Sequence, residues 1–304
     1  MLQPRHLREN DLVALVAPSG AVPEPWAVAA VEVVRGWGLR ARLGDNALNR
    51  WTHLAGTDAE RLADLNAALR DEEVRGVICL RGGYGVQRIV DGVDYAAVRA
   101  DPKLVLGFSD LTALHAALWR EAGVASVHGP TAAQFVEDAD ALGVRGARRA
   151  LMSPEPVTVA ADEAEDTFGV RVAGTARGTL LGGNLTMLAA TAGTRHALDL
   201  DGAILLIEAV GEEPYRVDRS LVQLKRAGWF AGIRGVAVGQ FAGCVDDGGP
   251  SVSDVLLEQL GSLGVPVLGG LPIGHGDQQV AVGLGVPAVL DAGAGTLVVR
   301  AAGR

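Results

Sequence analysis

The chain has 304 residues, a formal net charge of −9 and a hydrophobic content of 49%. This length is enough for one large or two medium domains, and the composition excludes a disordered chain. A chain with this acidic balance and no Lys/Arg cluster is also not a general nucleic-acid binder, because such a protein needs a basic face.

The cysteines and the first residues indicate where the protein is located and which metal or redox sites it lacks. Cys79 and Cys244 stand in apolar stretches, so we expect reduced core thiols, not a zinc or redox pair. The first eleven residues lack the apolar segment of a signal peptide, and no run of about 18 apolar residues exists. We therefore expect a cytoplasmic protein. The histidines and cysteines are not clustered, so we expect no metal and no cofactor.

The first half of the chain alternates between strand-like and helix-like patterns. Apolar stretches end at Gly, Pro or Ser, and helical spacing of apolar residues follows. These units predict a parallel sheet with helices on both faces, whose sites lie at the carboxyl ends of the strands. The predicted strands are Leu12–Ala17, Leu39–Leu43, Gly76–Leu80 and Lys103–Phe108; the predicted helices are Pro25–Trp37, one opened by the capping box Thr57-Asp58-Ala59-Glu60, and Val86–Val90.

The pattern breaks at a polar, acidic, proline-marked segment. We interpret 156–175 as a linker or crossing segment between a domain of residues 1–155 and a domain of residues 176–304. The second half has many short apolar runs separated by glycines, with helical patterns at Val217–Ala227 and Ser251–Leu260. It is therefore also predicted to be α/β, with more strand and shorter connections.

Ser109 stands on a tight turn between a predicted strand and the helical pattern that follows. Its hydroxyl would point away from the sheet, and the backbone amides behind it would lie at the positive end of a helix. A serine nucleophile is built in this way, and so is an ordinary helix N-cap. The local sequence leaves both readings open.

A serine nucleophile needs a base, and the base needs an acid that orients it. His275, between two glycines, is the stronger candidate for the base, and His128 is the second. Glu208 ends a buried apolar strand, where a charge must be paired, so it is the candidate acid. His115 is expected to be packed in its helix, His53 to lie near a site, and His6 and His196 to lie on the surface.

The glycine-rich turn Arg81-Gly82-Gly83-Tyr84-Gly85 has two further interpretations. Without side chains, Gly82 and Gly83 could bring a backbone amide close to a substrate, as one donor of an oxyanion hole. The amide of Asp110 would be the other donor. The spacing lacks the patterns of dinucleotide and phosphate loops, which disfavours nucleotide binding.

Seven stretches, in order and over nearly the whole chain, carry a resemblance to a known family. The stretches are Ala14–Gly20, Arg81–Gly85, Lys103–His115, His128–Pro130, Leu181–Leu185, Ile207–Arg219 and Pro272–Gly276. Together they resemble the LD-carboxypeptidase family, which includes muramoyl-tetrapeptide carboxypeptidases and microcin C immunity peptidases.

The resemblance implies a serine peptidase with the triad Ser109, Glu208 and His275. It implies an oxyanion hole from the amides of Asp110 and Gly83. The implied fold is a Rossmann-like N-terminal domain with a smaller, swivelling C-terminal α/β domain, in a homodimer. The implied substrate is a cytoplasmic murein tetrapeptide, cut at the L,D-amide bond before its terminal D-alanine in peptidoglycan recycling.

The substrate contacts are open at this level. Arg81, Tyr84 and Arg216 are candidates for holding the substrate, the two arginines for its carboxylate. The first alternative is an immunity-type peptidase that cleaves an aminoacyl- or peptidyl-nucleotide and stacks the base on aromatic residues; the aromatic candidates are Trp51, Tyr84, Tyr215 and Trp229. The second alternative is a catalytically silent two-domain ligand-binding protein.

Overall fold

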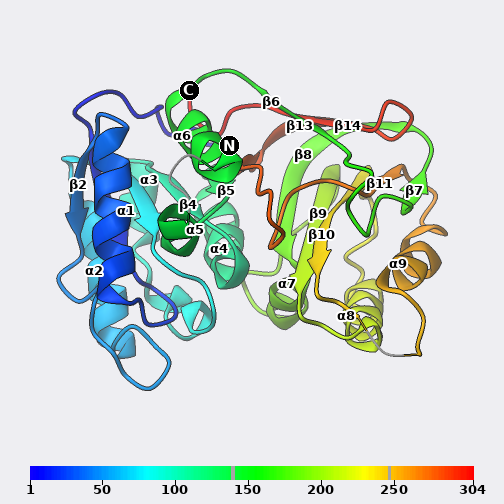
Figure 1. Ribbon diagram of the computed structural model, residues 1–304, viewed down its shortest axis with the longest axis horizontal. Helices are drawn as coiled ribbons and strands as arrows, with labels where there is room; N and C mark the ends of the chain where they lie inside the picture. Colours follow the sequence, from blue (N-terminus) through cyan, green and yellow to red (C-terminus); the bar gives the residue numbers. More distant parts are fainter. Residues whose placement is uncertain (138–140, 246–247) are drawn as a thin grey trace.

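The computed structural model describes residues 1–137, 141–245 and 248–304, without the side chains of residues 133 and 137. Two β-sheets stand side by side, each covered by helices, and the two ends of the chain meet above the junction between them (Figure 1). The Arg304 amide donates to the Pro4 carbonyl at 2.8 Å, which ties the C-terminus to the N-terminal segment. Within the described residues no helix has the length and apolar character needed to cross a membrane.

The first sheet has six strands in the order β12-β5-β4-β3-β1-β2. All neighbouring pairs are parallel except β12, which pairs antiparallel with β5. A strand from the second half of the chain therefore completes the sheet of the first half. The strands are β1 (Leu12–Val16), β2 (Arg40–Leu43), β3 (Val74–Cys79), β4 (Leu104–Gly107), β5 (Ser126–His128) and β12 (Val282–Leu284).

Helices cover both faces of this sheet, as predicted. Alternate residues of β1 belong to different cores: Val13 and Leu15 pack with α1 and α5, and Leu12 and Ala14 pack with α2 and α4. The helices are α1 (Glu24–Gly36), α2 (Asp58–Arg70), α3 (Tyr95–Ala100), α4 (Thr112–Ala122), α5 (Ala132–Glu137) and α6 (Leu142–Met152), and the 3₁₀ turns are η1 (Val86–Arg88), η2 (Val90–Gly92) and η3 (Ser109–Leu111).

The second sheet has eight strands in the order β6-β14-β13-β8-β9-β10-β11-β7. The four strands β8 to β11 are parallel, and the outer pairs are antiparallel. The strands are β6 (Val157–Ala160), β7 (Arg171–Val172), β8 (Thr175–Asn184), β9 (Ala203–Val210), β10 (Gly235–Ala242), β11 (Val267–Leu268), β13 (Val286–Asp291) and β14 (Thr296–Val299), and the helices are α7 (Leu185–Thr191), α8 (Pro214–Arg226) and α9 (Val252–Leu260).

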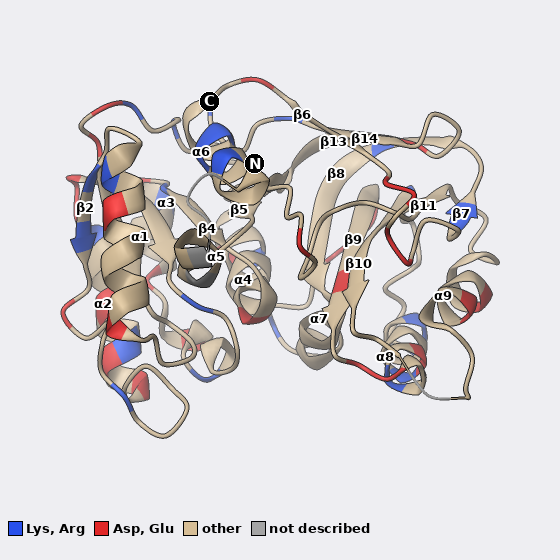
Figure 2. Ribbon diagram, in the orientation of Figure 1, with Lys and Arg blue, Asp and Glu red and all other residues tan. Residues whose placement is uncertain are grey.

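Charge follows this layering. Figure 2 shows the charged residues gathered on the outer helices and loops, and the central strands largely free of them. Cys79 and Cys244 are both buried and free, as expected from their apolar surroundings.

The capping box predicted at Thr57 is confirmed, since the Thr57 side chain accepts from the Glu60 amide. Other elements differ from the prediction. The stretch Val86–Val90 is not one helix but parts of two 3₁₀ turns, η1 and η2, with Ile89 between them. The Val86 amide, which opens η1, donates to the Asp110 carboxylate. The crossing segment 156–175 contributes β6 and β7 to the second sheet. Helices α3, α5 and α7 have only six or seven residues, which leaves little periodicity to detect. Helix α6 has 11 residues and was not predicted.

The two sheets are joined where α4 meets the end of β8. The Asn184 amide donates to Thr112 Oγ1 at 2.9 Å. Gly183 has φ of 138°, and a Cβ there would lie 2.6 Å from Thr112 Oγ1. Only glycine therefore permits this approach. One hydrophobic cluster also runs through both halves and contains Leu15 of β1 and Leu206 of β9.

Replacing Gly183 tests this junction. We expect Gly183→Val to lower the free energy of unfolding by about 2 kcal/mol or more, because the backbone is strained and the new side chain displaces Thr112. Urea unfolding measures the change. Gly36→Ala in α1 is the control, since a Cβ at Gly36 meets nothing within 4 Å. Equal stability of the two variants would contradict this account of the junction.

Candidate active site

The candidate site lies where strand ends of the two sheets face each other. In the first sheet, β3, β4 and β5 are neighbours, and their carboxyl ends carry Gly82, Ser109 and His128. In the second sheet, Glu208 is near the end of β9 and pairs with Asn184 of β8. His275 is in the loop after β11. Parallel strands bring these residues to one edge of each sheet.

Ser109 has the geometry of a strained elbow. Its φ is 64°, which is in the left-handed region that a serine rarely adopts. The helix that follows, α4, begins at Thr112, and its N-cap Leu111 makes no side-chain cap. Ser109 is therefore not the N-cap of α4, and the cap interpretation is wrong. A Cβ at Gly82 would lie 2.8 Å from Ser109 Cβ and 3.1 Å from its Oγ, so only glycine fits beside the hydroxyl.

A short hydrogen bond joins Glu208 and His275. The His275 Nδ1–H donates to Glu208 Oε2 at 2.6 Å. The Glu208 side chain is fully buried and that of His275 is 14% exposed. Burial disfavours the charge on Glu208, but the approach of His128 and His275 outweighs it and lowers the pKa of Glu208 to about 2. The carboxylate is thus ionised and fixes the imidazole.

Phe108 places this pair beside the serine elbow. Its ring centroid is 4.5 Å from that of His275 and 6.0 Å from that of His128. Phe108 directly precedes Ser109, so the imidazole of His275 packs against the residue next to the hydroxyl. These contacts place Glu208 and His275 beside the residue that precedes Ser109, although Glu208 and His275 are 99 and 166 positions further along the chain than Ser109.

The loop that carries His275 is held by Gln240 of β10. Its Nε2 donates to the Gln278 carbonyl at 3.0 Å and to Glu165 Oε1 at 2.7 Å, and its Oε1 accepts from the Gly276 amide at 2.8 Å. Gln240 is buried. Sequence reasoning missed this residue, although a glutamine inside the apolar stretch of a strand is a signal of a buried polar contact.

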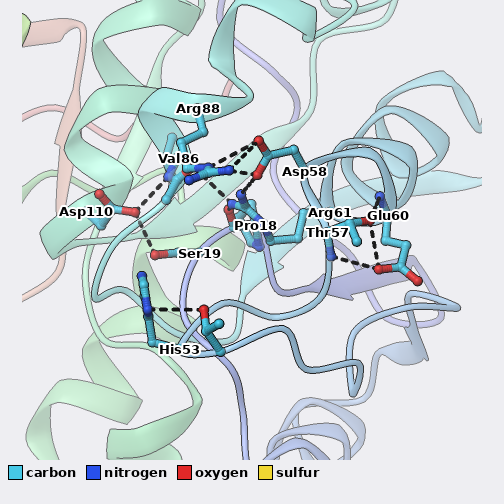
Figure 3. A network of polar contacts seen from close by, with 12 residues as sticks. Pro18, Ser19, His53, Thr57, Asp58, Glu60, Arg61, Val86, Arg88 and Asp110 are labelled. Atoms are coloured by element: carbon cyan, nitrogen blue, oxygen red, sulfur yellow. Dashed lines mark hydrogen bonds and ion pairs between the residues drawn. The ribbon is translucent and has the colours of Figure 1, made fainter.

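The carboxylate of Asp110 ties the first-sheet loops together. Its Oδ2 accepts from Ser19 Oγ at 2.6 Å and from the Val86 amide at 2.9 Å, as Figure 3 shows. Asp110 is buried, and burial raises its pKa despite these two hydrogen bonds. The sequence suggests a role only for the amide of Asp110. In the structure its side chain joins the turn after β1 to the turn after β3, beside Ser109.

A buried arginine extends this network. Arg61 of α2 donates to the carbonyls of Pro18 and Gly85, and it pairs with Asp58, which in turn pairs with Arg88 (Figure 3). The Arg61 side chain has no exposed surface. Charge-assisted bonds from one guanidinium therefore fix both glycine-containing turns around the elbow.

The glycines of the turn after β3 differ in what they do. Gly82 packs on Ser109, and its carbonyl accepts from the Gly20 amide at 3.1 Å. Gly83 has φ of 109°, a conformation that favours glycine, and a Cβ there would touch only Gly20. The assignment of the Gly83 and Asp110 amides to an oxyanion hole stays a prediction.

The three candidate substrate residues have partners of different kinds. Arg81 donates to the Ala21 carbonyl and lies over the ring of Trp26. Arg216 pairs with Glu213 at 3.1 Å and contacts Tyr215. Tyr84 is half exposed and lies next to the ring of His53, which is thus beside the glycine-rich turn.

The remaining histidines are buried. His115 donates from Nε2 to the Gly107 carbonyl at 2.9 Å, and burial lowers its pKa to about 4, so it is packed as expected. The expectation of surface positions for His6 and His196 is wrong. His6 packs against Gly303 at the chain end, and His196 lies between Asp91 and Glu121. Their polar neighbours in sequence gave no indication of these distant contacts.

A cavity opens directly on the candidate base. It has a volume of about 520 Å³ and reaches from the start of α5 and of α6 to the His275 loop. Its lining includes Pro130, Gln134, Val144, His275 and Asp277. The space beside the imidazole is therefore large enough for part of a peptide. Among the described residues there is no group of three or more His, Cys, Asp or Glu arranged to hold a metal.

A serine on a strained turn and an imidazole oriented by a buried carboxylate are the groups that a hydrolase of the serine type uses. The profiles of the LD-carboxypeptidase N-terminal and C-terminal domains match residues 13–129 and 177–290. The chain therefore belongs to the LD-carboxypeptidase family, and it is a carboxypeptidase of the serine type.

Individual relatives agree with this assignment. A Streptomyces coelicolor protein that carries a carboxypeptidase name is 44% identical, over 98% of this chain and 96% of its own. A Pseudomonas aeruginosa protein named murein tetrapeptide carboxypeptidase is 33% identical, over 92% of each chain. The crystal structure of muramoyltetrapeptide carboxypeptidase from Oxalobacter formigenes has a TM-score of 0.84 at 32% identity, over 95% of this chain and 98% of its own. A structure of MccF with glutamyl sulfamoyl guanosine shares the fold, with a TM-score of 0.88 at 20% identity, over 99% of this chain and 98% of its own.

Loss of the hydrogen bonds between Gln240 and the His275 loop should lower turnover more than stability. We expect Gln240→Leu to lower the carboxypeptidase kcat by about tenfold or more, because a small displacement of a catalytic group is costly. Gln223→Leu is the matched control: Gln223, on α8, makes one hydrogen bond to the Ala189 carbonyl. Steady-state kinetics give the kcat of both variants, and equal unfolding midpoints show that both are folded. Equal kcat values for the two variants would contradict a role of Gln240 in positioning the His275 loop.

The buried Glu208 carboxylate should leave a signature in stability at low pH. Its pKa is lowered from 4.5 to about 2, so its charge stabilises the fold fully above about pH 4.5, and this contribution is lost as the pH falls to about 2. It amounts to about 3 kcal/mol. We expect the stability difference between wild type and Glu208→Gln to shrink over this window, measured by urea unfolding at each pH. A difference independent of pH would contradict the ionised carboxylate.

Proposed function

We propose that the protein hydrolyses peptides with the triad Ser109, Glu208 and His275. The observation that carries this proposal is the 2.6 Å bond between His275 Nδ1 and Glu208 Oε2, beside a serine with φ of 64°. A bond from Nδ1 to the carboxylate leaves Nε2 of the imidazole to accept a proton.

The mechanism follows from these roles. His275 takes the proton of Ser109, and the serine oxygen attacks the carbonyl carbon of the scissile amide. The amides of Asp110 and Gly83 stabilise the oxyanion. His275 then gives the proton to the leaving amine, the C–N bond breaks, and water releases the acyl group from Ser109. Glu208 stays ionised and stabilises the imidazolium throughout.

The proposed substrate is a murein tetrapeptide, cut at the L,D-amide bond that releases the terminal D-alanine. Two relatives above 30% identity carry names with this substrate. Arg81, Tyr84 and Arg216 are proposed to bind the peptide. The turnover of such peptides belongs to peptidoglycan recycling, and we propose a cytoplasmic homodimer for this role.

The immunity-type reaction is the alternative that the MccF fold suggests. It would stack a nucleobase on an aromatic surface. Trp229 is buried in the core of the second sheet, so it is not available, whereas Trp51, Tyr84 and Tyr215 are each about half exposed. A direct comparison of substrates separates the two reactions.

A substrate panel tests the proposal. We expect release of D-alanine from the L,D-linked tetrapeptide and none from a D,D-linked peptide of equal length or from glutamyl sulfamoyl adenosine. Ser109→Ala should lower kcat by several orders of magnitude, because the nucleophile is lost. Ser153→Ala, outside the site, is the control. Preferred cleavage of the sulfamoyl adenosine would favour the immunity-type function, and full turnover by Ser109→Ala would refute the triad.

A further inference from the structure

Glu208 of the proposed triad and the neighbouring His128 face each other with polar atoms that have no hydrogen-bond partner. Glu208 uses Oε2 for His275, and its Oε1 is buried with no hydrogen bond. Both ring nitrogens of His128 are buried and unpartnered as well. The distance from His128 Nε2 to Glu208 Oε1 is 3.9 Å. Buried polar atoms are rarely left unpaired, so these atoms require an explanation.

The His128 ring makes no hydrogen bond to any described residue. Its side chain is 1% exposed, and the ring of Phe108 lies against it at 6.0 Å. His115, the other histidine that it influences, already uses Nε2 for the Gly107 carbonyl. The group that faces Nε2 is therefore the Glu208 carboxylate.

The contact also crosses the boundary between the two sheets. His128 ends β5 of the first sheet, and Glu208 is on β9 of the second. The antiparallel pairing of His128 with Val282 of β12 anchors it on the other side. A movement of about 1 Å between the sheets would bring the 3.9 Å separation to hydrogen-bond distance.

We propose that His128 is a positioning residue for the acid of the triad. Its Nε2–H is directed at Glu208 Oε1 and closes to a hydrogen bond when the sheets tighten around a substrate. The carboxylate is then held by an imidazole on each oxygen, one from each side of the sheet boundary. This role rests on the triad of the proposed function. It makes the orientation of Glu208 dependent on how closely the first sheet packs against the second.

The test uses a readout that does not depend on the identity of the substrate. A fluorophosphonate probe reacts with an activated serine, so its labelling rate reports how well His275 and Glu208 activate Ser109. We expect His128→Phe to lower the labelling rate and the kcat for tetrapeptide by about tenfold or more with KM unchanged, because the acid is misplaced. His128→Gln keeps a donor and should recover most of the rate.

His6→Gln is the matched control. His6 is another buried histidine with two unpartnered ring nitrogens, but it packs against Gly303 at the chain end. It should label at the wild-type rate. Labelling of His128→Phe at the wild-type rate, or an equal loss in the Phe and Gln variants, would overturn the proposal.

A second measurement needs no variant. Ring ¹⁵N chemical shifts of the wild-type protein report which nitrogen of each histidine carries a proton. The proposal requires a proton on Nε2 of His128, and a bare Nε2 would overturn it.

The outcomes also separate this inference from the proposed function. A wild-type protein that labels but does not cleave the tetrapeptide refutes the substrate and leaves the role of His128 to be decided by the variants. A wild-type protein that does not label refutes both the triad and the positioning role.

Discussion

A charge with no access to water governs the architecture of the site. The Glu208 carboxylate has no exposed surface, and a buried carboxylate without partners would be protonated or would unfold the protein. The protein keeps it charged by placing imidazoles near it, with His275 at 2.6 Å. The loop after β11 and the end of β5 must therefore both approach β9. The position of the two sheets relative to each other is in this sense an electrostatic requirement.

The remaining supports of the site are polar contacts that fix loops rather than touch the reacting groups. Gln240 holds the His275 loop from β10. The Asp110 carboxylate and the Arg61 guanidinium hold the turns that surround Ser109. Each support is buried, so water does not compete for its hydrogen bonds. The strained backbone of Ser109 is consistent with such a frame, because a strained residue persists only where its neighbours determine it.

The sequence predicted the parallel first sheet because its signals are local. An apolar run, a glycine or proline, and a helical pattern recur within a few tens of residues, and the Thr57 capping box marks a helix start directly. The same local reading selected Ser109, Glu208 and His275 as candidates. It could not decide between nucleophile and cap for Ser109, because that depends on a φ angle and on where α4 begins.

Features that depend on tertiary contacts could not be read from the sequence. The burial of His6 and His196 comes from residues far along the chain. The Asp110 carboxylate binds the Val86 amide, a contact that the local pattern of Val86–Val90 does not indicate. The pairing of β12 with β5 joins segments about 150 residues apart, and no turn between them predicts it. The β12–β5 pairing and the contacts of His6 and His196 join the two halves of the chain.

The pairing of β12 with β5 has a consequence for synthesis on the ribosome. Residues 282–284 leave the exit tunnel long after β1 to β5, so the nascent first sheet has an uncovered edge at Ser126–His128 while about half of the chain is still being made. An unpaired edge is a template for association with other chains. The hydrophobic cluster that both halves share is likewise incomplete until the end of the chain is available. The first half alone therefore exposes a strand edge, and the candidate site is complete only after His275, in the loop after β11, has been released.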